Sequence, residues 1–555
     1  MRRKLLIFIT LNSLFQAWVF GTDMVIFNGK VVTNDPLKPH AEAVAIEGNH
    51  IKAVGTRAEI ETLIDKHTVT IDAQGGSVLP GFNDAHLHFI GGGQSLLQLD
   101  LSGCANIVEI QNKVAAAARN TPAGDWITGR GWDHTLFNHG KWPTKGMLDA
   151  VTGEHPVFLR RIDGHVGWAN SKALQRAGIT SNTASPEGGE IGIDKKTGQL
   201  TGILKESAMN LITQKIPSIS QEQKERALYL ALQKAARLGV TSIQDNSGVE
   251  SLMLYKKLEE RGELTVRVSE WLDFAWAKSP DVLIQKIEIL KNYKSDKIRL
   301  GLFKGFVDGT LGSRTAYFFE PYDDDNSTVG LPQYSQEELN HLVSVADSLK
   351  LQIGLHCIGS KANYMALTAY ANAQEKNDSK NLRHRLEHAQ VLRLADIPDL
   401  AKYGIVASMQ PTHCTSDLRW AEKRIGYERC KGAYAWRRIL DSGAALAFGT
   451  DWPVEPLDPM RGLYSAVTRK NIKSGEPENG WFPDQCLSIE EAIYCYTAGP
   501  AYAEHQEGTK GRLAPGQLAD LVILSKDLLS IPPEEILTTH VNITIFDGKI
   551  IYQKE

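Results

Sequence analysis

The sequence predicts an α/β fold in which one barrel is wrapped by material from both chain ends. Apolar strand-like runs alternate with amphipathic helix-like segments through the middle of the chain; the run Ile353–His356, for example, follows the helix-like segment 336–349. Strands that alternate with helices indicate a parallel sheet. Short strand-like runs also occur at both ends, which indicates a small β module contributed by the two termini.

The terminal runs share the pattern of apolar residues bounded by turn signals. Near the N-terminus they follow one another with turns such as Asn28-Gly29 between them, and near the C-terminus the pattern returns. The runs are 24–27, 43–46, 68–71, 518–524 and 543–551. We therefore expect a composite β-sandwich from residues 22–78 plus 508–555, and a barrel over residues 79–507.

One long segment inside the barrel region breaks the alternation of strands and helices. It spans about residues 95–218 and is rich in Trp, Gly and charged residues, as in Gly131-Trp132-Asp133-His134. We interpret it as a large insertion after the first barrel strand.

Composition excludes several classes of function. The chain has 555 residues, 42% hydrophobic and 23% charged, which is ordinary for a globular protein, and a net charge of -4 without long runs of one sign. No basic groove for nucleic acid and no polybasic membrane surface is expected. Six cysteines without a CxxC pair disfavour a structural zinc knuckle. The expected partner is a small-molecule substrate.

The N-terminus has the features of an export signal. Three basic residues follow Met1, and an apolar stretch from Leu5 to Phe20 precedes Gly21. We expect a signal peptide over residues 1–21 and a periplasmic or secreted protein without stable membrane association; an uncleaved anchor is the alternative.

Two histidines separated by one residue give the strongest chemical signal. His86 and His88 closely follow an apolar run, Ser77-Val78-Leu79, and are expected to lie in a strand with it. That strand is expected to open into a glycine-rich loop, Gly91-Gly92-Gly93. On an extended chain, side chains two residues apart leave the same face. Because imidazole is a common ligand of zinc, the pair predicts a metal site, although packing histidines are the alternative.

Four further polar residues stand at or near the ends of apolar runs. Lys304 lies within the apolar run 298–307, where a lysine is costly unless its charge is paired or removed. Carbon dioxide could convert its amine to a carbamate that bridges two metals; pairing with an acid such as Asp308 is the alternative. His356, His388 and Asp451 each follow such a run.

The joint pattern favours chemistry over coincidence. Each group alone has a structural explanation, such as helix capping by Asp451. All of them, however, stand where strands end, and barrel enzymes place their active sites at the carboxyl ends of the strands.

The chain resembles the amidohydrolase superfamily, specifically amidohydrolase family 3, whose members resemble N-substituted formamide deformylase. Six segments from Met24 onward carry the resemblance: PGFNDAHLHF from Pro80, RIDGHVGWANSKAL from Arg161, KGFVDGTLGSRTA from Lys304, RLEHAQ from Arg385, ASMQPTH from Ala407 and AFGTDWPVEPLDP from Ala447. The resemblance implies a (β/α)8 TIM-type barrel, a composite β-sandwich, and hydrolysis of an amide-like carbon–nitrogen bond by metal-activated hydroxide.

The resemblance also implies roles for the ligand residues. His86 and His88 match the first metal's ligands, Lys304 the carboxylated bridging lysine, His356 and His388 the second metal's ligands, and Asp451 the ligand that is also the general base. Among oxygen and nitrogen ligands zinc is the default metal, as one or two ions. Family analogy also allows a homodimer.

Substrate choice is expected to depend on polar and aromatic residues near the predicted mouth of the barrel. The candidates are Trp132, His134, Asp163, His165, Arg314, His413 and Trp452. For His165 and Arg314 substrate orientation and structural hydrogen bonding are both open, and for Trp132 and Trp452 packing is favoured.

Two other functions remain open. A mononuclear deaminase acting on a ring C=N bond would use His86, His88, His356 and Asp451, with Lys304 only structural. A non-catalytic binding scaffold would be expected to have lost ligands, and none of the expected ligands is missing from the sequence.

Overall fold

Eight parallel strands form the centre of the molecule in the computed structural model, which describes residues 21–134, 136, 141–162, 164, 166–186, 188–217 and 220–555. In spatial order the strands are β8 (Phe82–Leu87), β15 (Val240–Asp245), β16 (Arg267–Asp273), β17 (Ile298–Phe306), β18 (Ile353–His356), β19 (Arg385–Glu387), β20 (Val406–Met409) and β21 (Leu446–Phe448). Backbone hydrogen bonds from Asp451 N to His86 O (2.7 Å) and from His88 N to Trp452 O (2.8 Å) join the first and last strands beyond β21. The nearly closed parallel sheet confirms the predicted TIM-type barrel.

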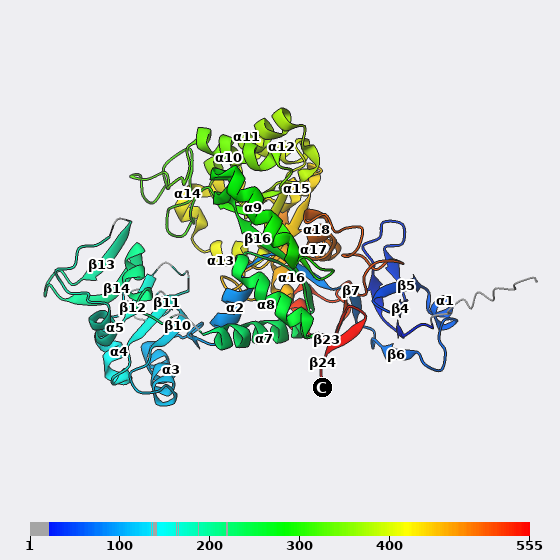
Figure 1. The fold of residues 1–555 in the computed structure, drawn as a ribbon, viewed down its shortest axis with the longest axis horizontal. Helices are drawn as coiled ribbons and strands as arrows, with labels where there is room; N and C mark the ends of the chain where they lie inside the picture. The colour runs from blue at the N-terminus through cyan, green and yellow to red at the C-terminus, as the bar shows by residue number, and fades with distance from the viewer. Residues whose placement is uncertain are drawn as a thin grey trace, which may run out of the picture.

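Helices surround the barrel (Figure 1). Several of them follow a barrel strand directly, as in the predicted alternation. They are α2 (Phe89–Ser95), α7 (Gln221–Arg237), α8 (Val249–Glu260), α9 (Pro280–Leu290), α10 (Gln336–Ser348), α11 (Ser360–Asn377), α12 (Ile397–Lys402), α13 (Pro411–Asp417), α14 (Ala421–Cys430), α15 (Trp436–Asp441), α16 (Pro459–Thr468), α17 (Ile489–Tyr496) and α18 (Ala498–Ala503). The largest apolar core of the molecule lies between these helices and the strands.

The stretch around Gly81 differs from the prediction. The apolar run before the two histidines is not the start of the histidine strand: it is β7 (Ser77–Pro80), which pairs with the terminal strands, and the chain enters β8 only after Gly81. A side chain at Gly81 would collide with Thr241, whose Oγ1 would lie 2.1 Å from an added Cβ. The close approach of the two segments therefore requires a residue without a side chain at the junction.

The glycine-rich stretch is helical and not a loop. Gly91, Gly92 and Gly93 lie inside α2, against the expectation from composition. A Cβ on Gly92 would lie 2.2 Å from the Trp452 ring, and one on Gly93 would lie 2.3 Å from Ala227 O. The glycines thus let α2 pack tightly beside Trp452, which follows Asp451.

Strands from the two chain ends share one apolar core (Figure 1, dark blue and red). One sheet has the order β5-β4-β1-β6 and the other β24-β23-β22-β7-β2-β3. These strands are β1 (Met24–Phe27), β2 (Lys30–Val32), β3 (His40–Ala41), β4 (Ala43–Glu47), β5 (His50–Gly55), β6 (Val69–Asp72), β22 (Leu521–Leu524), β23 (Val541–Phe546) and β24 (Lys549–Gln553). Short helices α1 (Arg57–Glu61) and α19 (Pro533–Ile536) accompany them.

A buried ion pair ties this terminal module to the barrel. Arg267, at the start of β16, donates from Nε to Asp520 Oδ2 (2.6 Å) and from Nη2 to Asp547 Oδ1 (3.0 Å). Burial raises the pKa of Asp547, but hydrogen bonds from Arg267 and from Asn49 outweigh burial and lower it to about 2.

The Asp547→Asn variant is expected to lose a pH-dependent part of the stability. Because the pKa of Asp547 is lower in the folded than in the unfolded chain, its contribution is present above about pH 4 and disappears as the pH falls toward 2. Thermal unfolding from pH 6 to pH 3 should show a lower midpoint for the variant at pH 6 and a narrowing difference below pH 4. A difference that is constant with pH would contradict this assignment.

The inserted segment folds into a sheet of its own (Figure 1, cyan, at one side of the barrel). Its order is β13-β14-β12-β11-β10-β9, and helices pack on it to form two small apolar cores. The elements are β9 (Leu99–Asp100), α3 (Ile107–Asn120), β10 (Ile127–Trp132), α4 (Lys145–Thr152), β11 (Val157–Arg161), β12 (Val166–Ala169), α5 (Ser171–Arg176), β13 (Gly189–Ile193), β14 (Leu200–Glu206) and α6 (Asn210–Thr213).

The predicted signal peptide lies almost entirely outside the described residues, which begin at Gly21. Among the helices that the structure does describe, none combines the length and the apolar character that crossing a bilayer requires.

Candidate metal centre

His86 and His88 enter the site from the end of β8. His86 lies within the strand, whereas His88 stands one residue beyond it, at the start of α2. Their ring centroids are 6.0 Å apart. Each ring is oriented by a contact at Nδ1: His86 Nδ1 lies 2.7 Å from Glu387 Oε2, and His88 Nδ1 lies 3.0 Å from Asn246 O. These contacts leave Nε2 of both rings available to a ligand.

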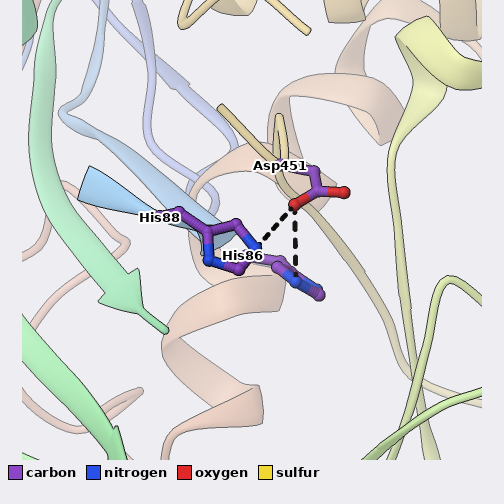
Figure 2. A group of neighbouring side chains, drawn as sticks. All are labelled: His86, His88 and Asp451. Atoms are coloured by element: carbon purple, nitrogen blue, oxygen red, sulfur yellow. Dashed lines mark ion pairs between the residues drawn. The ribbon is translucent and has the colours of Figure 1, made fainter. Parts of the chain in front are cut away.

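Asp451 brings a carboxylate to the two histidines (Figure 2). Its Oδ1 lies 3.3 Å from His88 Nε2 and 3.7 Å from His86 Nε2. The residue follows β21 and has a backbone φ of 56°, in the left-handed region that residues other than glycine rarely adopt. The hydrogen bond from its backbone N–H to His86 O fixes this conformation. The same hydrogen bond that joins the first and last strands of the barrel therefore also orients the Asp451 carboxylate.

A second pair of histidines lies near Asp451, after β19 and after β20. His388 follows β19 and His413 lies in α13, with their rings stacked at 6.0 Å. His413 Nε2 lies 3.9 Å from Asp451 Oδ2. Among the described residues, two groups of three could each hold an ion: His86, His88 and Asp451, and His388, His413 and Asp451.

This arrangement differs from the expected ligand set at two histidines. His413 was predicted to contact substrate, but the structure places its ring nitrogen with the candidate ligands. His356 is near, with its ring centroid 4.5 Å from that of His388, yet its Nε2 lies 3.1 Å from Gly309 O. His356 belongs to neither group of three.

Lys304 is buried beside the first group. Its Nζ lies 3.3 Å from His86 Nε2, and the Trp271 ring centroid lies 5.3 Å from the same nitrogen. Burial lowers the pKa of Lys304 to about 8, although the charges of Glu387 and Asp451 partly oppose this. Asp308, the acid named in the structural alternative for Lys304, instead accepts hydrogen bonds from the backbone N–H groups of Ile358 and Gly359.

The protonation states suit metal ligands. Burial, with the nearby Lys304, lowers the pKa of His86 to about 4 and that of His356 to about 3, and burial also holds the pKa of His388 well below its usual value. Burial alone would raise the pKa of Asp451, but the neighbouring imidazoles outweigh it and keep the pKa well below the usual range. At neutral pH, His86, His356 and His388 are therefore neutral imidazoles and Asp451 is a carboxylate. Burial would lower the pKa of His88, but its hydrogen bond to Asp451 outweighs burial and raises that pKa.

Unsatisfied polar atoms show that the residues fit a cation. Asp451 Oδ1 and His413 Nε2 are buried without a hydrogen-bond partner of suitable geometry. Buried polar atoms without partners are rare and costly, and a bound ion is one of the explanations for them in native proteins. Imidazole nitrogens and a carboxylate oxygen are the ligands that zinc and related divalent metals accept.

A buried charge pair, which sequence reasoning did not identify, contacts His86 at Nδ1, the ring nitrogen opposite its candidate ligand atom. Glu387 Oε1 lies 2.7 Å from Arg385 Nε, and the other oxygen contacts His86. Arg385 Nη2 also donates to Ala85 O and Ser408 Oγ, at 2.7 Å each. Burial raises the pKa of Glu387, but Arg385 and His86 outweigh it and lower the pKa to about 2. The available signal was the presence of two charged residues on either side of Leu386 in the short strand before His388.

The remaining substrate candidates have structural contacts. Trp132 is fully buried in the core of the insertion and donates to Leu159 O (2.9 Å), which agrees with the packing role favoured for it over substrate contact. Arg314 donates from Nε and Nη2 to both oxygens of Asp324, at 3.0 Å each, which favours its structural alternative.

Of the other candidates, Trp452 is buried and packs edge-on against Phe89, as expected for a packing residue. His134 stacks on Trp142 at 3.8 Å. Asp163 and His165 lie outside the described residues.

Comparison with known proteins gives consistent results. Residues 69–552 match the amidohydrolase family. Protein LONG AFTER FAR-RED 3 of Arabidopsis thaliana is 34% identical, over 93% of this chain and 89% of its own length. N-substituted formamide deformylase of Arthrobacter pascens is 27% identical, over 96% of this chain and 98% of its own length. The crystal structure of an uncharacterized metal-dependent hydrolase from Pyrococcus horikoshii has a TM-score of 0.74 and 29% identity, over 92% of this chain and 99% of that one.

The family match covers most of the chain, and the histidine and aspartate groups lie where the strands of the barrel end. The chain belongs to the amidohydrolase family and is a metal-dependent hydrolase.

Proposed function

We propose that the protein hydrolyses an amide-like carbon–nitrogen bond, as in an N-substituted formamide, an N-acyl amine or a cyclic amide. The observation that supports this most directly is the position of Asp451, whose two oxygens face His86 and His88 on one side and His413 on the other. A carboxylate shared by two groups of imidazoles can bind a cation and also exchange a proton with a reactant. The likeness to N-substituted formamide deformylase supports the choice of bond.

The residues of the site have two roles, metal binding and proton transfer. His86, His88, His388 and His413 would hold one or two divalent ions together with Asp451, and zinc is the metal that best matches these ligands. When bound, the metal lowers the pKa of water toward ~7 and polarises the substrate carbonyl. Asp451, ionised at neutral pH, accepts the proton of the attacking water and returns it to the leaving nitrogen.

The environment of Lys304 supports carboxylation of its amine. With a pKa of about 8, a substantial fraction of the amine is neutral near pH 7 to 8 and is therefore nucleophilic. Attack on carbon dioxide forms a nitrogen–carbon bond and releases one proton, which leaves a carbamate anion in place of a cation. Such an anion, close to His86 Nε2, would add an oxygen ligand and allow a second ion to bind.

Removal of the metal is expected to abolish hydrolysis reversibly. Protein treated with a chelator should lose at least about 99% of its activity on a panel of N-formyl and N-acyl amines, because the water loses its activation. Activity should return with zinc, and with bicarbonate the metal content should approach two ions per chain. In a Lys304→Met variant bicarbonate should have no effect.

Two outcomes would count against this function. Full activity in protein shown to be metal-free would exclude a metal-activated reaction. One ion per chain, together with indifference to bicarbonate and turnover of a ring C=N substrate, would support the mononuclear deaminase instead.

A further inference from the structure

An apolar side chain is open to solvent beside the metal centre. Phe306, the last residue of β17, is 46% exposed. Its ring centroid lies 4.9 Å from Lys304 Nζ and 5.3 Å from the centroid of the His356 ring. A single exposed phenylalanine is common on protein surfaces, but this one touches two residues of the candidate site. Its open face is therefore available to a molecule bound at the metal.

A pocket begins at the same place. It has a volume of about 330 Å³, which suits part of a small organic molecule. Lys304 and Phe306 line it from β17, and residues from the end of β16 onward and residues before α10 complete it. The polar and aromatic lining residues are Asp273, Lys278, Lys304, Phe306, Gln333 and Tyr334. Lys304 connects the pocket with the candidate ligands, because its Nζ lies 3.3 Å from His86 Nε2.

The charges around the pocket do not favour an anion. Lys278 lies 5.9 Å from the Tyr334 ring centroid, but Glu338 Oε1 is 3.5 Å from its Nζ. Asp273 adds a second negative charge, with one oxygen accepting from Ala275 N (2.8 Å). A carboxylated Lys304 would place a third negative charge at the inner end. Two aromatic rings with no excess of positive charge suit a neutral apolar group.

We propose that this pocket is the subsite for an uncharged, ring-bearing substituent of the substrate, held between Phe306 and Tyr334. The inference rests on the proposed function, because it takes the scissile bond to lie at the metal ligands beside Lys304. It narrows the substrate class to amides with a neutral apolar or aromatic substituent, and it disfavours N-acyl amino acids, whose carboxylate would enter a pocket that already contains Asp273.

Binding of three ring-bearing probes to the metal-loaded protein tests the proposal without any turnover. The probes are benzyl alcohol, benzenesulfonate and benzyltrimethylammonium, which share a ring and differ in charge, and their affinities can be measured by ligand-observed NMR titration. Benzyl alcohol is expected to bind at least about tenfold more tightly than benzenesulfonate, and also more tightly than benzyltrimethylammonium. Equal or tighter binding of benzenesulfonate would overturn the proposal.

Variants assign the binding to this pocket. Phe306→Ala is expected to weaken the affinity for benzyl alcohol about tenfold, because the contact between two rings is lost. Phe306→Leu is expected to weaken this affinity less, because leucine keeps part of the apolar contact. Phe319→Ala is the matched control: Phe319 is similarly exposed but contacts Tyr364 and Arg393 and none of the ligands. Metal content and thermal midpoint would verify that each variant is folded. Equal effects of the Phe306 and Phe319 variants would overturn the assignment.

A gain of binding gives a second, independent check. Glu338→Gln removes the partner of Lys278, so benzenesulfonate should bind several-fold more tightly while benzyl alcohol is unchanged. No change for benzenesulfonate would contradict the charge argument. Because these titrations need no hydrolysis, probe binding without amide turnover would refute only the proposed function, and turnover without probe binding would refute only this inference.

Discussion

Replacing Asp451 with asparagine is expected to reduce kcat by about 10³-fold or more, because the variant cannot accept the proton of the attacking water. Asparagine has nearly the same shape, so the backbone hydrogen bond from residue 451 to His86 O should persist and the thermal midpoint should change little. The loss also removes a charged ligand from both groups of three. Metal content measured beside kcat separates the two effects.

Asp458→Asn is the matched control for this experiment. Asp458 lies seven residues later, where its side chain accepts from Met460 N at the start of α16, and asparagine can cap a helix equally well. We expect its kcat to stay within twofold of the unchanged protein. If Asp451→Asn kept kcat within tenfold while fully loaded with metal, Asp451 would not be the general base.

Replacing Arg385 with leucine is expected to destabilise the protein by about 3–5 kcal/mol. The substitution leaves Glu387 fully buried without its charge partner, and removing one member of a buried pair costs about this much. It also removes the hydrogen bonds to Ala85 O and Ser408 Oγ. The urea midpoint of unfolding measures the loss.

A surface pair provides the comparison. Arg393 binds Asp396 at 2.7 Å with its side chain 41% exposed, and such pairs contribute at most about 1 kcal/mol. Arg393→Leu should therefore shift the midpoint only slightly. Similar shifts for the two leucine variants would show that the Arg385–Glu387 pair is not a buried support of His86.

Local sequence pattern predicted the elements whose apolar period is regular. The strand Ile353–His356 agrees residue for residue with β18, and the predicted helix 336–349 differs from α10 by one residue. The sequence could not show that the apolar run before Gly81 belongs to the terminal sheet, because that depends on pairing with Leu521–Leu524, more than four hundred residues away. The sheet of the insertion was not predicted, because its strands have only two to seven residues and such short runs carry a weak periodic signal.

The same distinction applies to the site. The histidines, Lys304 and Asp451 were recognisable because each stands at or near the end of a barrel strand, where parallel strands bring polar residues together. The contact between His86 and Glu387 joins residues 301 positions apart, and no local pattern reveals such a partner. The solvent-exposed ring of Phe306 beside Lys304 likewise becomes visible only in the folded structure.

The most direct test of the account is a crystal structure of the zinc-loaded protein with anomalous scattering at the zinc edge. We predict an anomalous peak within about 2.0–2.2 Å of the Nε2 atoms of His86 and His88 and of an Asp451 oxygen. Zinc bound elsewhere, with these three side chains at the distances seen here and no peak between them, would contradict the central claim that they form the metal centre.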